Sequence, residues 1–289
     1  MMSSGKLERL MLATDFSPHA DRALEWAIAL ARRFGASLEL VSSVHVVPFA
    51  SGPNVFAPPA DFLRGVRDAT DQRLSELARE LAARGVPTSY TVLLEDPSSG
   101  ICALAREKAI DLLALGTRGR TGLAHVVLGS VAERTARLAP CPVLTLHSDV
   151  SPPQPLRKLL VASDFSEPAR AALALARKLV EPGGQLVLAH AIPAIMAPGD
   201  TPLPDPRSES WARAEYEKWK PTLDGVGSEL DLRYGAPDTV LIDAAVRHGA
   251  DAIVMGTQGR TGLAHMFLGS IAEKVIRRAP LPVFSAKTP

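Results

Sequence analysis

Two glycine-rich segments with the same spacing are the part of this sequence that points most directly to chemistry. Both read G-x2-G-x9-G-S, one over residues 116–130 and the other over residues 256–270. Glycine has no Cβ, so its backbone can approach a ligand closely. A helix that starts after the last glycine would offer free N–H groups and the positive end of its dipole to a phosphate. The spacing therefore predicts two phosphate-binding loops.

A carboxylate follows a short apolar run near the start of each half of the chain. Asp15 and Asp164 can accept hydrogen bonds from ribose hydroxyls, as acidic residues do at the ends of strands in dinucleotide-binding folds. The alternative is purely structural: the glycines make tight turns, Ser130 and Ser270 cap helices, and the two aspartates accept backbone donors before a helix. The residue pattern alone leaves both interpretations open.

The chain contains an internal repeat, which organises everything else. Residues 111–142 align with 251–282 without a gap, and more than half of the aligned positions are identical. Residues 12–17 and 161–166 form a second matching pair, in the same order in each half. We therefore expect two domains, 1–148 and 156–289. The proline-rich stretch at about 149–155 suits an exposed linker.

Within each half, short apolar runs alternate with helical patterns. Strands are expected at 10–14, 38–47, 89–94, 111–115 and 143–146, and again at 159–163, 186–192, 229–234, 251–255 and 283–286. Helices are expected at 18–34, 62–84 and 97–108, at 167–180, 208–220 and 237–248, and after each glycine loop. The proline-rich stretches 48–59 and 193–206 can be neither regular helix nor central strand.

This alternation predicts the fold class. It indicates two tandem doubly wound α/β domains, each with a five-stranded, mostly parallel sheet. We expect the last strands of the two halves to pair with each other, because pairing would cover two exposed sheet edges.

With these motifs in place, the chain resembles a tandem universal stress protein of the ATP-binding branch. The resemblance runs from Thr14-Asp15-Phe16-Ser17 to the Ala-Pro-x-Pro-Val endings at 139–143 and 279–283, and both halves carry the glycine signature. It implies an adenine-nucleotide α-hydrolase-like fold, ATP bound at the carboxyl edge of the sheet, and pairing through the last strand.

The resemblance also implies nucleotide contacts residue by residue. In the first half they fall on Ala13, Thr14, Asp15, Ser43, Leu115, Gly116, Arg118, Gly119, Gly129, Ser130 and Val131, with Val46 as an alternative to Ser43. In the second half they fall on Ala162, Ser163, Asp164, Ala191, Met255, Gly256, Gln258, Gly259, Gly269, Ser270 and Ile271. Gln258 stands where the first half has Arg118, so the second half lacks a cation there and is expected to bind triphosphate more weakly.

The function implied is that of a nucleotide-binding regulatory protein of the stress response. It would bind ATP or another adenine nucleotide, with Mg or Mn carried by the phosphates, and would hydrolyse ATP weakly at most; no catalytic residue is assigned. The alternatives are a nucleotide-free oligomeric scaffold and an adenylate-forming enzyme of the related fold. Such enzymes carry S-G-G-x-D-S or H-x-G-H at the end of the first strand, and residues 13–17 and 162–166 match neither.

Composition narrows the possible partners. The formal net charge is +1, without the basic excess of a nucleic-acid-binding protein. The apolar stretches fall far short of the ~20 residues of a membrane helix, and the two cysteines lack the spacing of metal ligands. We therefore expect a cytoplasmic protein that binds neither nucleic acid nor membrane, holds no metal with protein ligands alone, and can form a further homodimer.

Overall fold

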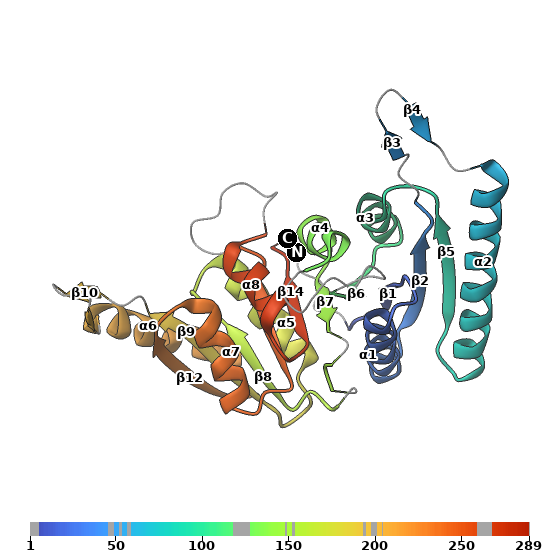
Figure 1. The fold of residues 1–289 in the computed structure, drawn as a ribbon. Coiled ribbons are helices and arrows are strands. Elements are labelled where there is room, and N and C mark those ends of the chain that lie inside the picture. Colours follow the sequence, from blue (N-terminus) through green and yellow to red (C-terminus); the bar gives the residue numbers. More distant parts are fainter. Residues whose placement is uncertain are drawn as a thin grey trace.

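One continuous sheet runs through the chain (Figure 1). The computed structural model describes residues 6–45, 49–51, 54–56, 59–117, 128–147, 149–151, 154–192, 195–197, 201–203, 205–258 and 268–288. Within them, the main sheet has 10 strands in the order β12-β9-β8-β13-β14-β7-β6-β1-β2-β5. The first half contributes β1 (Arg9–Ala13), β2 (Ser37–Ser43), β5 (Thr88–Leu93), β6 (Leu112–Gly116) and β7 (Val143–Leu146). The second contributes β8 (Lys158–Ala162), β9 (Gln185–Ile192), β12 (Gly227–Tyr234), β13 (Ala252–Gly256) and β14 (Val283–Ala286).

Helices cover both faces of this sheet, which is why its central strands are almost entirely apolar. On β1, Leu10 and Leu12 pack into the core on one face, and Met11 and Ala13 pack into the core on the other. Neighbouring strands within each half are parallel. Each half therefore forms a doubly wound five-stranded sheet, and the predicted fold class is confirmed.

A hydrophobic core lies on each face of the sheet, and each helix packs into one of these two cores. Helices α1 (Pro18–Phe34), α2 (Ala60–Ala83), α5 (Glu167–Leu179) and α6 (Pro206–Trp219) cover one face. Helices α3 (Pro97–Glu107), α4 (Ser130–Leu138), α7 (Pro237–Arg247) and α8 (Ser270–Arg278) cover the other, and a 3-10 turn, Lys220–Leu223, follows α6. None of the helices in the described part of the chain is both long and apolar enough to cross a membrane.

The predicted helix starts are confirmed at the two related helices α1 and α5. Ser17 precedes α1 and its side chain accepts a hydrogen bond from the Ala20 N–H, which satisfies a donor that lacks a partner inside the helix. Ser166 does the same for α5. Gly35 ends α1 with a left-handed φ of 64°, a conformation that glycine adopts without strain.

Each proline-rich stretch contains a small hairpin apart from the main sheet. The strands are β3 (Phe49–Ser51) with β4 (Asn54–Phe56), and β10 (Ile195–Ala197) with β11 (Thr201–Leu203). None of the described residues of these stretches lies in the main sheet, as expected, but Pro206 already belongs to α6, and the hairpins were not predicted. Strand β2 was expected to continue to residue 47, but it ends at Ser43.

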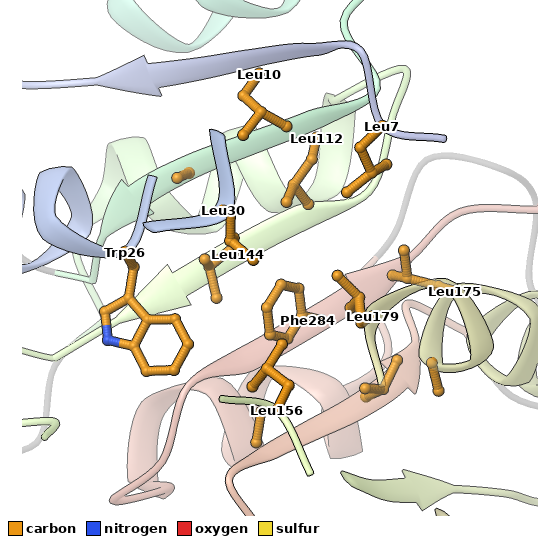
Figure 2. Packing of buried hydrophobic residues seen from close by; sticks show 14 of the residues in the cluster. Leu7, Leu10, Trp26, Leu30, Leu112, Leu144, Leu156, Leu175, Leu179 and Phe284 are labelled. Atoms are coloured by element: carbon orange, nitrogen blue, oxygen red, sulfur yellow. The ribbon is translucent and has the colours of Figure 1, made fainter. Parts of the chain in front are cut away.

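The two halves join through their last strands, as predicted. Strands β7 and β14 pair antiparallel, with Leu144 opposite Phe284. Side chains reinforce this pairing, because the Thr145 hydroxyl donates to the Val283 carbonyl and the Ser285 hydroxyl to the Val143 carbonyl, each at 3.2 Å. Figure 2 shows that Leu144 and Phe284 lie in one apolar cluster with side chains from both halves, so the core is continuous across the junction.

Candidate functional site

A tight turn follows β1 and places Asp15 at the carboxyl edge of the sheet. The Thr14 hydroxyl accepts a hydrogen bond from the Phe16 N–H at 3.0 Å, and the Asp15 carboxylate accepts one from the Ser17 N–H at 3.1 Å. The structural role considered for this aspartate is therefore real. It does not exclude ligand binding, because Asp15 also lines a pocket described below.

The same turn is strained in both halves. Phe16 has a φ of 59° and Phe165 a φ of 60°, which is unusual for a bulky side chain. Such a conformation costs about 1–3 kcal/mol and persists where the surroundings enforce it, often at functional sites. In the second half, Ser163 accepts from the Phe165 N–H at 3.1 Å and Asp164 from the Ser166 N–H at 3.0 Å. Strain repeated at equivalent positions marks both turns as candidate sites.

The first glycine of each signature has a packing role. A Cβ placed on Gly116 would lie 2.7 Å from the backbone carbonyl carbon of His19 in α1. On Gly256 it would lie 2.8 Å from the Pro168 Cβ and 2.9 Å from the Pro168 carbonyl carbon in α5. These two glycines let the first helix of each half approach the sheet, a packing role that the sequence pattern did not predict.

The last glycine of each signature starts a helix instead. Gly129 is the residue before α4, with φ −63° and ψ 139°, and no side chain caps the helix start. Its N–H donates to the Thr117 carbonyl at 2.8 Å, so that amide is already used. The N–H groups of the first turn, on Ser130, Val131 and Ala132, have no acceptor within the helix. Ser130 is thus not a cap, and the α4 N-terminus keeps these backbone donors and the positive end of its dipole at this edge of the sheet.

These elements converge on a pocket of about 210 Å³ at the carboxyl ends of β1, β2 and β6. Its described lining residues are Ala13, Thr14, Asp15, Ala20, Val41, Ser43, Pro97, Ile101, Leu115, Gly116, Thr117, Gly129, Ser130, Val131 and Ala132. The lining combines an apolar wall, one carboxylate and a helix N-terminus. This is where open α/β sheets bind ligands, outside the carboxyl ends of the strands.

All of the predicted first-half residues that the structure describes line this pocket. Arg118 and Gly119, and Val46 as the alternative to Ser43, lie outside the described residues. Sequence reasoning missed the wall formed by Val41 and Ile101. The apolar pattern placed both residues inside, but the register that sets Ala13 opposite Val41, and the packing of α3 against the sheet, bring them to the pocket.

The second half repeats the turn and the strand register of the first. Ser163 donates its N–H to the Ala189 carbonyl at 2.9 Å, as Thr14 does to Val41, and Ala162 lies opposite Ala189. This register makes Ala191 the counterpart of Ser43. A Cβ on Gly269 would lie 3.7 Å from the Gln258 Cα, so the predicted Gln258 lies beside the start of α8.

The remaining predicted residues occupy matching positions. Met255 and Gly256 end β13, Ser270 and Ile271 begin α8, and Gly259 lies outside the described residues.

A charged pair joins the two helices that flank the pocket, α3 and α4. Asp96 caps α3, and the backbone N–H of Ser99 holds the pKa of this carboxyl below its ordinary value. The same carboxylate lies 3.4 Å from Arg134 of α4, which ties together the two helices that flank the pocket. Among the described residues, no three His, Cys, Asp or Glu side chains are grouped as metal ligands.

The geometry agrees with what comparison with known proteins shows. The sequence model of the "Universal stress protein family" matches residues 6–147 and 155–287. The chain therefore belongs to the universal stress protein family, and it carries two copies of the family's domain in tandem.

Its relatives include both single-domain and tandem proteins. Universal stress protein Rv2623 of Mycobacterium tuberculosis is 28% identical over 303 residues, which cover 99% of each chain. Universal stress protein YxiE of Bacillus subtilis is 31% identical over 145 residues, 48% of this chain and 98% of its own. The crystal structure of a universal stress protein from Archaeoglobus fulgidus shares the fold, with a TM-score of 0.77, 23% identity, and 99% and 100% of the two chains covered.

Proposed function

We propose that this tandem universal stress protein binds an adenine nucleotide, ATP foremost, at the carboxyl edge of each half-sheet, and that binding regulates its association with partners. We take residues 1–148 and 156–289 as the two binding domains and about 149–155 as the linker. The observation that carries the proposal is the pocket in which Asp15, an apolar wall and the α4 N-terminus converge.

Each part of a nucleotide has a matching part of this pocket. Val41, Ile101 and Leu115 offer an apolar wall for the adenine ring. Asp15 can accept hydrogen bonds from the ribose hydroxyls, and the first turn of α4 can bind phosphate oxygens through its N–H groups. The volume of about 210 Å³ is below the roughly 300–1,000 Å³ of typical ligand pockets, so we expect the base and ribose to be enclosed and the phosphates to extend outward.

The lining favours binding over dedicated catalysis. Phosphoryl transfer needs a positioned nucleophile as well as charge neutralisation. Asp15 is the only ionisable side chain among the described lining residues, and its carboxylate already accepts the Ser17 N–H. We infer weak hydrolysis at most, with Mg or Mn carried by the phosphates, and a cytoplasmic regulatory role in which a further homodimer is possible.

Calorimetric titration with ATP tests the proposal. Gly129→Val places a branched side chain at the start of α4, where the backbone angles suit valine, so the phosphate approach is blocked without backbone strain. We expect the first-site affinity to fall at least tenfold, or about 1.4 kcal/mol. Gly65→Val on α2 is the matched control, because a Cβ there meets nothing within 4 Å. An unchanged affinity for the Gly129 variant contradicts the assignment, and no ATP heat in the wild-type protein favours a nucleotide-free scaffold.

A further inference from the structure

Each half supplies a side chain that hydrogen-bonds a backbone carbonyl at the C-terminal end of the other half's last helix, α4 or α8. His147 follows β7 in the first half, and its Nε2 lies 2.9 Å from the Ile276 carbonyl in the last turn of α8. Lys287 follows β14 in the second half, and its Nζ donates to the Arg137 carbonyl in the last turn of α4 at 2.5 Å. The last carbonyls of a helix lack partners within it, so each half satisfies a group that the other half leaves unpaired.

The helices capped in this way begin at the candidate sites. Helix α8 starts at Ser270 in the second site, and Ile276 lies six residues further on, about 9 Å along the axis. Helix α4 likewise starts at Ser130 in the first site and ends beside Lys287. A change at the capped end of a short, rigid helix is therefore felt at its N-terminus, in the other half's site.

His147 is also connected to the first site itself. Its Nδ1 lies 3.0 Å from the Thr117 hydroxyl, and both side chains are buried. Thr117 lines the first pocket, and its carbonyl accepts the Gly129 N–H at 2.8 Å. A continuous chain of hydrogen bonds thus runs from Gly129 through Thr117 and His147 to α8.

The protonation of His147 follows from its partners. A carbonyl oxygen can only accept, so Nε2 carries the hydrogen that is donated to Ile276. In the neutral ring, Nδ1 then accepts from the Thr117 hydroxyl; in the charged ring, Nδ1–H donates to it, and the hydroxyl can turn to the Leu146 carbonyl at 3.2 Å. Both states keep the connection intact.

The second half is built differently at the equivalent position. Thr257 accepts the Gly269 N–H at 2.8 Å, just as Thr117 accepts the Gly129 N–H. Lys287 replaces the histidine, and its ammonium group reaches Arg137 in the other half. Lysine has a single nitrogen, which lies at the Arg137 carbonyl, whereas the two nitrogens of an imidazole ring face different partners; among the described residues, no hydrogen bond joins Lys287 to the Thr257 hydroxyl. The hydrogen-bonded connection from pocket to neighbouring helix is thus a property of the first site.

We propose that His147 couples the two sites, so that a nucleotide in the first pocket stabilises α8 and prepares the second site for binding. The inference rests on the proposed function. Phosphates at the start of α4 hold Gly129 in place, Gly129 holds Thr117, and Thr117 holds the His147 ring against α8. The second nucleotide then meets a helix that is already ordered, which is positive cooperativity. Since one net hydrogen bond contributes about 0.5–1.5 kcal/mol, the coupling is about 2- to 10-fold.

Amide hydrogen exchange of α8 tests this inference in the full chain. Ser270→Glu first blocks the second site, because a carboxylate at the start of α8 repels phosphate and suits the helix dipole. ATP bound at the first site is then expected to slow exchange in the last turn of α8 about 2- to 10-fold. Calorimetry on the same protein confirms that ATP is bound.

A matched pair of variants identifies the route. His147→Lys keeps a donor for Ile276, as Lys287 provides for Arg137, but lacks the second ring nitrogen that holds the Thr117 hydroxyl, so the ATP effect on α8 disappears. Lys287→Met removes the other cap and leaves the ATP effect in place. Bound ATP without a change in α8, or an effect that survives His147→Lys, overturns the coupling. An absence of ATP binding in calorimetry overturns the proposed function instead.

Discussion

The packing role of Gly256 gives the sharpest test of how this fold is built. Gly256→Ala adds a Cβ that would lie 2.8 Å from the Pro168 Cβ, 2.9 Å from its carbonyl carbon and 2.9 Å from its carbonyl oxygen. Two of these atoms are backbone and cannot rotate away, so the start of α5 must move from the sheet. Overpacking costs typically 1–3 kcal/mol, and we expect about 3 kcal/mol here.

Chemical denaturation measures this cost, with Gly269→Ala as the control from the same signature. Gly269 has φ −61° and ψ 142°, and its added Cβ would meet the Thr257 carbonyl oxygen at 3.2 Å, so we expect a loss within about 1 kcal/mol. Thermal unfolding of the Gly256 variant is expected roughly 6–12 °C lower than wild type, at about 2–4 °C per kcal/mol. Equal stability of the Gly256 variant and the wild-type protein would refute the close approach of α5.

Three further predictions concern single side chains. Asp15→Ala is expected to weaken the binding of ATP at least tenfold and the binding of 2′,3′-dideoxy-ATP much less. Asp15→Asn keeps an acceptor for the Ser17 N–H and so controls for the structure of the turn. Equal losses of affinity for both nucleotides would show that no ribose contact exists. Gln258→Arg is expected to raise the affinity of the second site for ATP, and to raise it more at low salt. If the gain in affinity did not depend on salt, a contact between residue 258 and the phosphates would be contradicted. Burial lowers the pKa of Lys287 to about 8, below the unfolded value of 10.5. Keeping the buried ammonium group charged therefore destabilises the folded state below pH 8, and this destabilisation disappears as the pH rises from 8 to 10.5. From pH 7 to 10 the wild-type protein should gain on the order of 2 kcal/mol relative to Lys287→Met, and parallel pH curves in urea denaturation would contradict this.

Local patterns predicted most of the elements, because each has its own sequence signal. The apolar run before Asp15, the helix starts after Ser17 and Ser166, and the start of α4 after Gly129 all depend on neighbours in the sequence. The predicted end of β2 was wrong: the apolar pattern continues into residues 44–47, but the strand ends at Ser43.

The chemistry of the site depended more on contacts between distant segments. The sequence pattern could not show that Gly116 serves helix packing, or that the Gly129 N–H is taken by the Thr117 carbonyl. It also could not show that His147 contacts Ile276 in the other half, because that bond requires β7 and β14 to pair antiparallel. These features follow from strand register and from the return of the chain to the sheet edge, which local spacing does not encode.

A crystal structure of the wild-type protein grown with ATP tests the central claim most directly. We expect the adenine ring against Val41 and Ile101, the ribose hydroxyls at Asp15, and the phosphates at the first turn of α4. A structure in which ATP at millimolar concentration leaves this pocket empty, or binds elsewhere on the protein, would contradict the claim that the carboxyl edge of the sheet is a nucleotide site.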